Sequence, residues 1–135
     1  MMVTVRAAKS KGSQFEYDVQ YSISFLYDDI YRTSERGFQR QYDLRSDKYN
    51  ACIECKRLKG ISWNQLVAFY EKLKKVTPDA DKRYIIFQSN RQPPLVFNEL
   101  LTNQKRYQIR EFDTVFGVPF RKHPSTRVKT EEEHA

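Results

Sequence analysis

The sequence predicts an α/β fold in which a small mixed β-sheet is flanked by helices. Two observations predict this class. Segments with apolar residues at helical spacing alternate along the chain with short apolar runs typical of strands. The hydrophobic content of 39% and the aromatic content of 14% fit a globular core rather than a disordered chain. At 135 residues the chain is expected to form one domain.

The first predicted helix carries apolar residues near the 3.6-residue period from Phe15 to Ile30. Ser13 and Glu16 have the spacing of a capping box, which marks the start of a helix. Residues Tyr31 to Ser34 then predict a short strand. The polar segment 35–41 predicts a turn or loop.

Two strands of a hairpin are predicted at Tyr42–Leu44 and Tyr49–Leu58, joined by the polar residues 45–48. A second helix is predicted from Ser62 to Val76, because Ser62 and Gln65 form another capping box before an apolar face.

The second half of the chain predicts further strands. Residues Arg83 to Gln88 have the composition of a buried strand, and Pro93-Pro94 breaks the chain after it. Leu95 to Phe97 predicts a short strand or a helix entry, and Tyr107 to Phe120 is apolar enough to pack.

Composition divides the chain into a basic N-terminal arm (1–11), a folded domain (12–121) and a charged, disordered tail (122–135). The 24 Lys and Arg residues outnumber the 17 Asp and Glu residues, which gives a net charge of +7. This charge favours polyanionic partners, chiefly nucleic acid.

No apolar run approaches the roughly 20 residues that span a membrane, and the N-terminus lacks a signal-peptide core. We therefore expect an intracellular, cytoplasmic protein with no membrane partner. Cys52 and Cys55 have no second pair and no suitably spaced His to complete a zinc site. On a strand they face opposite sides, which predicts two reduced, buried thiols.

The main functional motif is Asp43 followed eleven residues later by Glu54-x-Lys56. Strand side chains alternate between faces, so Glu54 and Lys56 are expected to point the same way. Asp43 arrives from the preceding segment and can close on Glu54 to form a carboxylate pair. Such oxygen ligands suit Mg²⁺ or Mn²⁺. The Lys56 ammonium could then steer a water or neutralise charge on a phosphodiester.

A longer ordered set that includes this motif resembles the PD-(D/E)XK nuclease superfamily, and within it the archaeal-type (Hjc-like) Holliday junction resolvases. The set is Lys11-Gly12, Glu16, Asp43 and Glu54-x-Lys56. The resemblance covers about residues 11–90. It implies a restriction-endonuclease-like core, a Mg²⁺-dependent DNA cut, and a homodimer that binds four-way junctions. It also implies a role in DNA recombination and repair in a prokaryotic, archaeal or viral (phage) host cell.

The resemblance implies roles for individual residues. Asp43 and Glu54 match the metal-binding carboxylates, and Lys56 matches the catalytic lysine. Glu16 matches the acid of the first helix that supports the metal site. Lys11-Gly12 matches the element that places the backbone near DNA phosphate.

Basic residues within or beside these segments are expected to contact DNA phosphates without reading sequence. They are Arg32, Arg36, Arg40, Arg45, Lys48, Arg57 and Lys59. Together with Lys11 and Gly12 they make up the expected DNA-binding residues.

Each of these residues also has a structural explanation. Capping of the helix together with Ser13 is a sufficient structural role for Glu16. Asp43 fits a strand-end acid, and Glu54 with Lys56 fits a solvated strand face. Asp47 competes for the metal role but falls in the predicted hairpin turn.

Other readings of the chain remain open. Tyr42 stands where the family usually has Pro, and Gln65 with Phe69 resembles a RecB-like feature although capping already explains Gln65. The same fold could serve a nicking, restriction-like or repair nuclease, and a non-catalytic DNA-binding module is the alternative from another class. A Cas4-type exonuclease is disfavoured because two cysteines cannot supply a four-thiolate cluster. The apolar surface for a dimer interface is expected in Leu95 to Phe97 or Val115 to Phe120.

Overall fold

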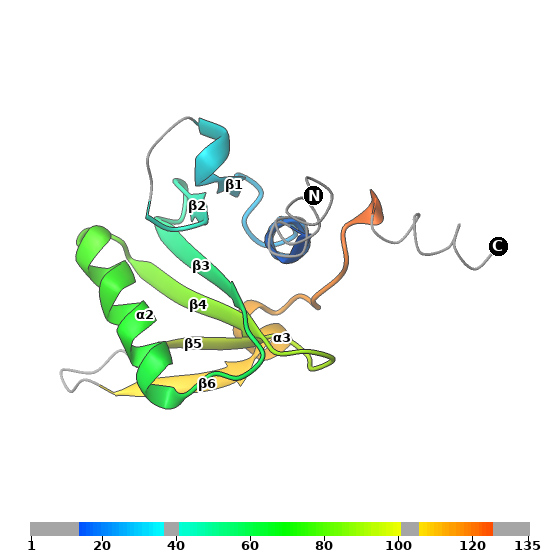
Figure 1. Ribbon diagram of the computed structural model, residues 1–135. Coiled ribbons are helices and arrows are strands. Elements are labelled where there is room, and N and C mark those ends of the chain that lie inside the picture. The colour runs from blue at the N-terminus through cyan, green and yellow to red at the C-terminus, as the bar shows by residue number, and fades with distance from the viewer. Residues whose placement is uncertain (1–13, 37–40, 101–105, 126–135) are drawn as a thin grey trace, which may run out of the picture.

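The computed structural model describes residues 14–36, 41–100 and 106–125. Its centre is a six-stranded mixed sheet in the order β1-β2-β3-β4-β5-β6 (Figure 1). The strands are β1 (Tyr31–Arg32), β2 (Leu44–Ser46), β3 (Ala51–Arg57), β4 (Lys82–Gln88), β5 (Leu95–Glu99) and β6 (Tyr107–Glu111). The predicted α/β class with a small mixed sheet is confirmed.

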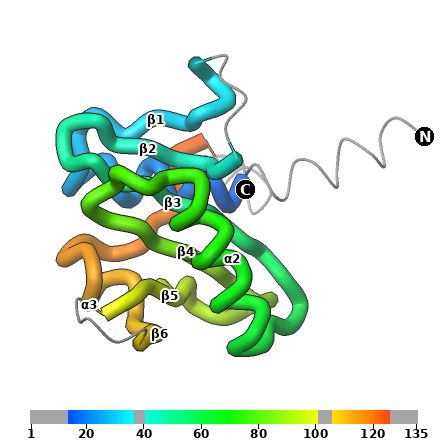
Figure 2. The backbone as a smooth tube through the Cα atoms, turned by 90° about the vertical axis from the view of Figure 1, so that its left-hand side faces the viewer, coloured from blue at the N-terminus to red at the C-terminus, as the bar shows by residue number. Residues whose placement is uncertain are grey.

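Helices cover both faces of this sheet. The α2 helix (Trp63–Val76) lies across one face, as the side view in Figure 2 shows. The other face carries a helix over residues 14–23, which we call the first helix, and the short α3 helix (Phe112–Phe116). A 3₁₀ turn, η1 (Thr33–Arg36), follows β1. No helix within the described ranges is long and apolar enough to cross a membrane.

Strand pairing is uneven across the sheet. The parallel pair β3–β4, connected through α2, is in register over seven residues. Its antiparallel neighbours are shorter: β2 pairs with β3 only at residues 51–53, and β5 pairs with β4 only at residues 85–87. The second half of β3 and the first residues of β4 therefore each have one strand neighbour instead of two.

Alternating side chains divide the apolar residues into two cores. On one face, the first helix and α3 pack over the sheet with Ile53, Ile86 and Val96. On the other face, α2 buries Leu66, Tyr70 and Leu73 against residues that include Ile85 and Phe97. Burial on both faces explains the short apolar runs at residues 51–53 of β3 and 84–87 of β4.

The first helix is shorter than predicted, because it ends at residue 23 instead of 30. The Ser22 hydroxyl donates to the Asp18 carbonyl (2.8 Å), and the backbone then leaves the helix in a turn. Tyr27 and Ile30 reach the core from this turn, while Leu26 is 38% exposed. The prediction that one helical face carries all of these apolar residues is therefore wrong.

The hairpin is also displaced from its predicted position. The turn occupies residues 47–50 rather than 45–48, and Asn50 adopts a left-handed conformation with φ of 49°. Arg45 consequently belongs to β2, and Asp43 immediately precedes that strand.

Both segments considered for a dimer interface are used inside this chain. Val96 and Phe97 are fully buried in β5, between β4 and β6. Phe116 is buried, and Val115, Val118 and Phe120 pack against the same core. These segments do not supply an exposed apolar surface, so that prediction is wrong.

The described part of the predicted tail lies against the first helix. The backbone N–H of Arg121 donates to Ser22 Oγ and that of His123 to Asp18 Oδ1, each at 2.7 Å. Residues 126–135 and the predicted arm 1–11 lie outside the described residues.

Candidate metal centre

Asp43 is fixed at the point where β2 stops pairing with β3. Its backbone N–H donates to the Ile53 carbonyl (3.1 Å), and its side-chain Oδ2 accepts from the Cys55 N–H (2.7 Å). The Asp43 carboxylate therefore accepts the hydrogen bond that a backbone carbonyl of β2 would accept if the β2–β3 pairing continued. Continuing the register Leu44↔Ile53 by one residue would place Asp43 opposite Glu54.

Glu54 faces Asp43 from the middle of β3. The side chain is half-buried, and burial raises the pKa of Glu54 to about 9. A hydrogen bond with Asp43 and the negative charge of Asp43 add to this rise in pKa, whereas Lys56 and Lys72 oppose it. Glu54 therefore keeps its proton at neutral pH when no cation lies between the two acids.

Glu16 lies on the first helix, which covers the opposite face of the sheet, and the charge of Asp43 links it to the acid pair. Burial, and then the charge of Asp43, raise the pKa of Glu16, while Arg32 lowers it. Arg32 Nη2 lies 3.4 Å from Glu16 Oε2, and the guanidinium stacks 4.2 Å from the centre of the Tyr17 ring. Arg32 therefore acts as the counterion of Glu16, and its contact with DNA phosphate stays a prediction. Ser13, the predicted capping partner of Glu16, lies outside the described residues.

Lys56 lies on the same side of β3 as Glu54, as the strand alternation predicts. Its Nζ sits 4.6 Å from the centre of the Phe69 ring of α2. Sequence reasoning missed Lys72, also on α2, whose charge acts on Glu54. The spacing of Gln65, Phe69 and Lys72 places all three on one helical face, and this spacing could have identified Lys72 from the sequence.

The acid pair consists of oxygen ligands of the kind that a divalent cation uses. Two half-buried carboxyl groups repel each other when ionised, and a divalent cation between them would remove that repulsion. Mg²⁺ commonly uses one or two carboxylates and keeps several waters. In the described ranges no three His, Cys, Asp or Glu side chains are placed to hold a metal together. Asp43 and Glu54 fit the two-carboxylate arrangement.

The predicted DNA-binding residues fall into distinct groups. Arg45 is engaged within the hairpin by Asp47 (2.6 Å) and by Asn50 (3.2 Å). Lys48 pairs with Asp28 at 3.6 Å. Asp47 lies in this turn, away from the acid pair, and so does not compete for the metal role.

Arg36, Arg57 and Lys59 are exposed. Arg36 stacks 4.0 Å from the centre of the Tyr31 ring. Lys11, Gly12 and Arg40 lie outside the described residues.

Two further residues have structural roles. Gln65 Oε1 accepts from the Ser62 N–H while Ser62 Oγ accepts from the Gln65 N–H, so the predicted capping box is present. Cys52 and Cys55 are free thiols that pack against opposite cores. Burial, followed by the charge of Asp43, raises the pKa of the Cys55 thiol, which keeps it protonated.

Comparison of the chain with models of protein families, with curated proteins and with solved structures finds no match. The nuclease resemblance therefore rests on the residues of this chain alone.

Replacing Glu54 with Gln should stabilise the metal-free protein increasingly as the pH rises. Unfolded Glu54 ionises above about pH 4.5, but the folded group holds its proton up to about pH 9. The free energy of unfolding of the wild type therefore falls across this interval, and Glu54→Gln lacks that fall. We expect a gain of about 1–3 kcal/mol at pH 8 and almost none near pH 4.5, allowing for solvent screening at the half-buried site.

Urea unfolding in EDTA at several pH values measures this difference. The matched control is Glu111→Gln, which changes an exposed acid on β6 and should show no comparable dependence on pH. A destabilised Glu54→Gln variant at pH 8 would contradict the assignment of a repelling acid pair.

Proposed function

We propose that the protein is a Mg²⁺-dependent, structure-selective DNA endonuclease with a PD-(D/E)XK-type core, and that it cuts four-way (Holliday) junctions. One observation carries the proposal: two facing carboxyl groups, Asp43 and Glu54, with Lys56 beside Glu54 on the same strand. A purely structural strand face would not place two acids in mutual repulsion at a half-buried position.

The residues of the chain would divide the chemistry between them. Asp43 and Glu54 would hold the ion, and their positions are set by the β2–β3 junction. The Mg²⁺ would lower the pKa of a water and polarise the scissile phosphate. Lys56, held over Phe69, would stabilise the negative charge that develops on the phosphate. Mn²⁺ would substitute because it accepts the same oxygen ligands.

Binding would draw on the basic surface beside the acids. Arg57 ends β3, only one residue beyond Lys56, and Lys59 follows it; both are exposed. The net charge of +7 would strengthen the encounter with DNA. A four-way junction has near two-fold symmetry, so paired cuts would use a two-fold homodimer.

Substituting the acid pair should abolish cleavage. For Asp43→Asn, Glu54→Gln and Lys56→Met we expect the rate of cutting a labelled four-way junction with Mg²⁺ to fall by about 10²-fold or more. The matched control Asp47→Asn changes an acid of the hairpin turn and should retain the wild-type rate. Wild-type activity in Asp43→Asn or Glu54→Gln would disprove the assignment.

The same assay distinguishes the alternatives. A panel of four-way, three-way, flap and linear DNA, with Mg²⁺ and with EDTA, separates a resolvase from a nicking, restriction-like or repair nuclease. Binding to all of these DNAs without any cut, together with no detectable binding of divalent metal, would favour the non-catalytic module.

Neutralising Arg57 and Lys59 together should flatten the salt dependence of DNA binding. Each phosphate contact contributes roughly 0.9 to the slope of log K against log salt, so losing two should lower it by about 1.8. Lys75→Gln is the control, since Lys75 is exposed in the last turn of α2. Fluorescence anisotropy at several salt concentrations measures the slope. An unchanged slope in the double variant would remove both residues from the footprint.

A further inference from the structure

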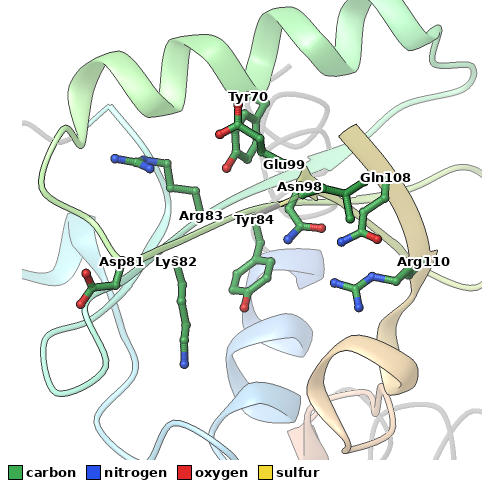
Figure 3. A pocket seen from close by; sticks show the side chains of 10 residues that line it. Tyr70, Asp81, Lys82, Arg83, Tyr84, Asn98, Glu99, Gln108 and Arg110 are labelled. Atoms are coloured by element: carbon green, nitrogen blue, oxygen red, sulfur yellow. The ribbon is translucent and has the colours of Figure 1, made fainter. Parts of the chain in front are cut away.

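The sheet opens between β4 and β5 at the end away from Lys56. Pairing of these strands ends at Ile85↔Phe97, so Tyr84 and Asn98 are not paired although both belong to the sheet. β5 continues beside β6 to the pair Glu99↔Tyr107. The opening is a cavity of about 870 Å³, lined by residues of β4, β5 and β6 (Figure 3).

Two polar atoms in the wall of this cavity are buried without a hydrogen-bond partner. They are Asn98 Oδ1, an acceptor, and Arg110 Nε, a donor. Asn98 pairs with Gln108 and Val96 with Arg110 across β5 and β6, so Asn98 and Arg110 are diagonal neighbours on one face. Buried polar atoms in folded proteins are normally hydrogen-bonded, so these two side chains keep a capacity to accept and to donate further hydrogen bonds.

The volume of the cavity is that of a small-molecule site and far exceeds that of one or two bridging waters. One water occupies about 30 Å³ of liquid, whereas small-molecule sites enclose about 300–1,000 Å³. In Figure 3, Asn98, Gln108 and Arg110 point to the same side of the sheet as the Tyr84 ring, and Tyr70 lies on the α2 side.

Among the charged residues that line the cavity, Glu99 and Arg83 already have partners within the protein. Glu99 is held by Lys74 at 3.3 Å, and Arg83 Nε donates to Thr77 Oγ1 at 3.0 Å. In the part of the chain that the structure describes, Arg110 has no ion-pair partner. A free guanidinium inside a half-enclosed cavity is suited to a phosphate or carboxylate.

The neighbouring amides indicate which anion fits. Asn98 and Gln108 lie opposite each other, and each presents one acceptor and one donor group, the pattern that pairs with the edge of a nucleobase. The Tyr84 ring is held edge-on against Phe116, with ring centres 4.9 Å apart, and offers a surface beside them. Base recognition by the amides and phosphate recognition by Arg110 together describe a nucleotide.

We propose that the opening between β4 and β5 binds a nucleotide, with Asn98 and Gln108 on the base and Arg110 on the phosphate. The ligand would be either a free nucleoside monophosphate or one unpaired nucleotide of a strand. The site shares no residue with Asp43, Glu54 or Lys56 and does not depend on the proposed nuclease activity.

The test is a titration of the full chain in EDTA, followed by calorimetry and by amide NMR shifts. The probes are adenosine, guanosine, cytidine and uridine 5′-monophosphates, inorganic phosphate, and single-stranded DNA of about ten nucleotides. At least one monophosphate, or the single strand, should bind about tenfold more tightly than phosphate. Binding of a monophosphate identifies a free-nucleotide site, and binding of the strand alone identifies an unpaired-nucleotide site.

Variants locate the binding. Asn98→Leu and Arg110→Gln should each weaken it about tenfold, and Gln108→Leu provides a second test if Asn98→Leu fails to fold. Arg91→Gln, at an exposed position of the loop before β5, should bind as the wild type does. The proposal is overturned if no probe binds at millimolar concentration, or if the Asn98, Gln108 and Arg110 variants bind unchanged.

Discussion

The parallel pairing of β3 with β4 is the frame on which the rest of the molecule depends. Its register runs over seven residues, while each antiparallel neighbour pairs with it over only three. The sheet therefore separates at both ends of this frame, between β2 and β3 at one end and between β4 and β5 at the other. Polar side chains lie at both separations. At the first, the Asp43 carboxylate accepts a hydrogen bond from the Cys55 N–H, which has no neighbouring strand to bond on that side. At the second, Asn98 and Arg110 each have a buried polar atom without a partner.

At the β2–β3 separation, one hydrogen bond decides the electrostatics. The Cys55 N–H holds the Asp43 carboxylate, and this brings it against Glu54. Arg32 neutralises Glu16, but Lys56 and Lys72 only partly offset the interaction between the two facing acids. The fold thus stores an unfavourable carboxyl pair that a divalent cation would relieve, which is the physical basis of the proposed activity.

Local patterns predicted the parts of this arrangement that depend on neighbouring residues. The alternation of strand side chains placed Glu54 and Lys56 on one face, and the Ser62–Gln65 spacing predicted the capping box that begins α2. The separations could not be predicted in this way, since they depend on where pairing between strands stops. The end of the first helix was not predictable, because it coincides with tertiary contacts of Ser22, whose hydroxyl also bonds the backbone of Arg121. The pairing of Asn98 with Gln108 could not be predicted either, because it depends on the register between β5 and β6 and no sequence motif marks it.

If Asp43 and Glu54 hold a divalent cation as proposed, the ion must displace the proton that Glu54 carries at neutral pH. This proton can be counted by calorimetric titration of the metal-free protein with Mg²⁺ or Mn²⁺ at pH 7, in two buffers of different ionisation enthalpy. We expect release of about one proton per ion bound, and loss of this release in Glu54→Gln. Metal binding without proton release, or equal binding by Glu54→Gln and the wild type, would rule out the proposed cation site.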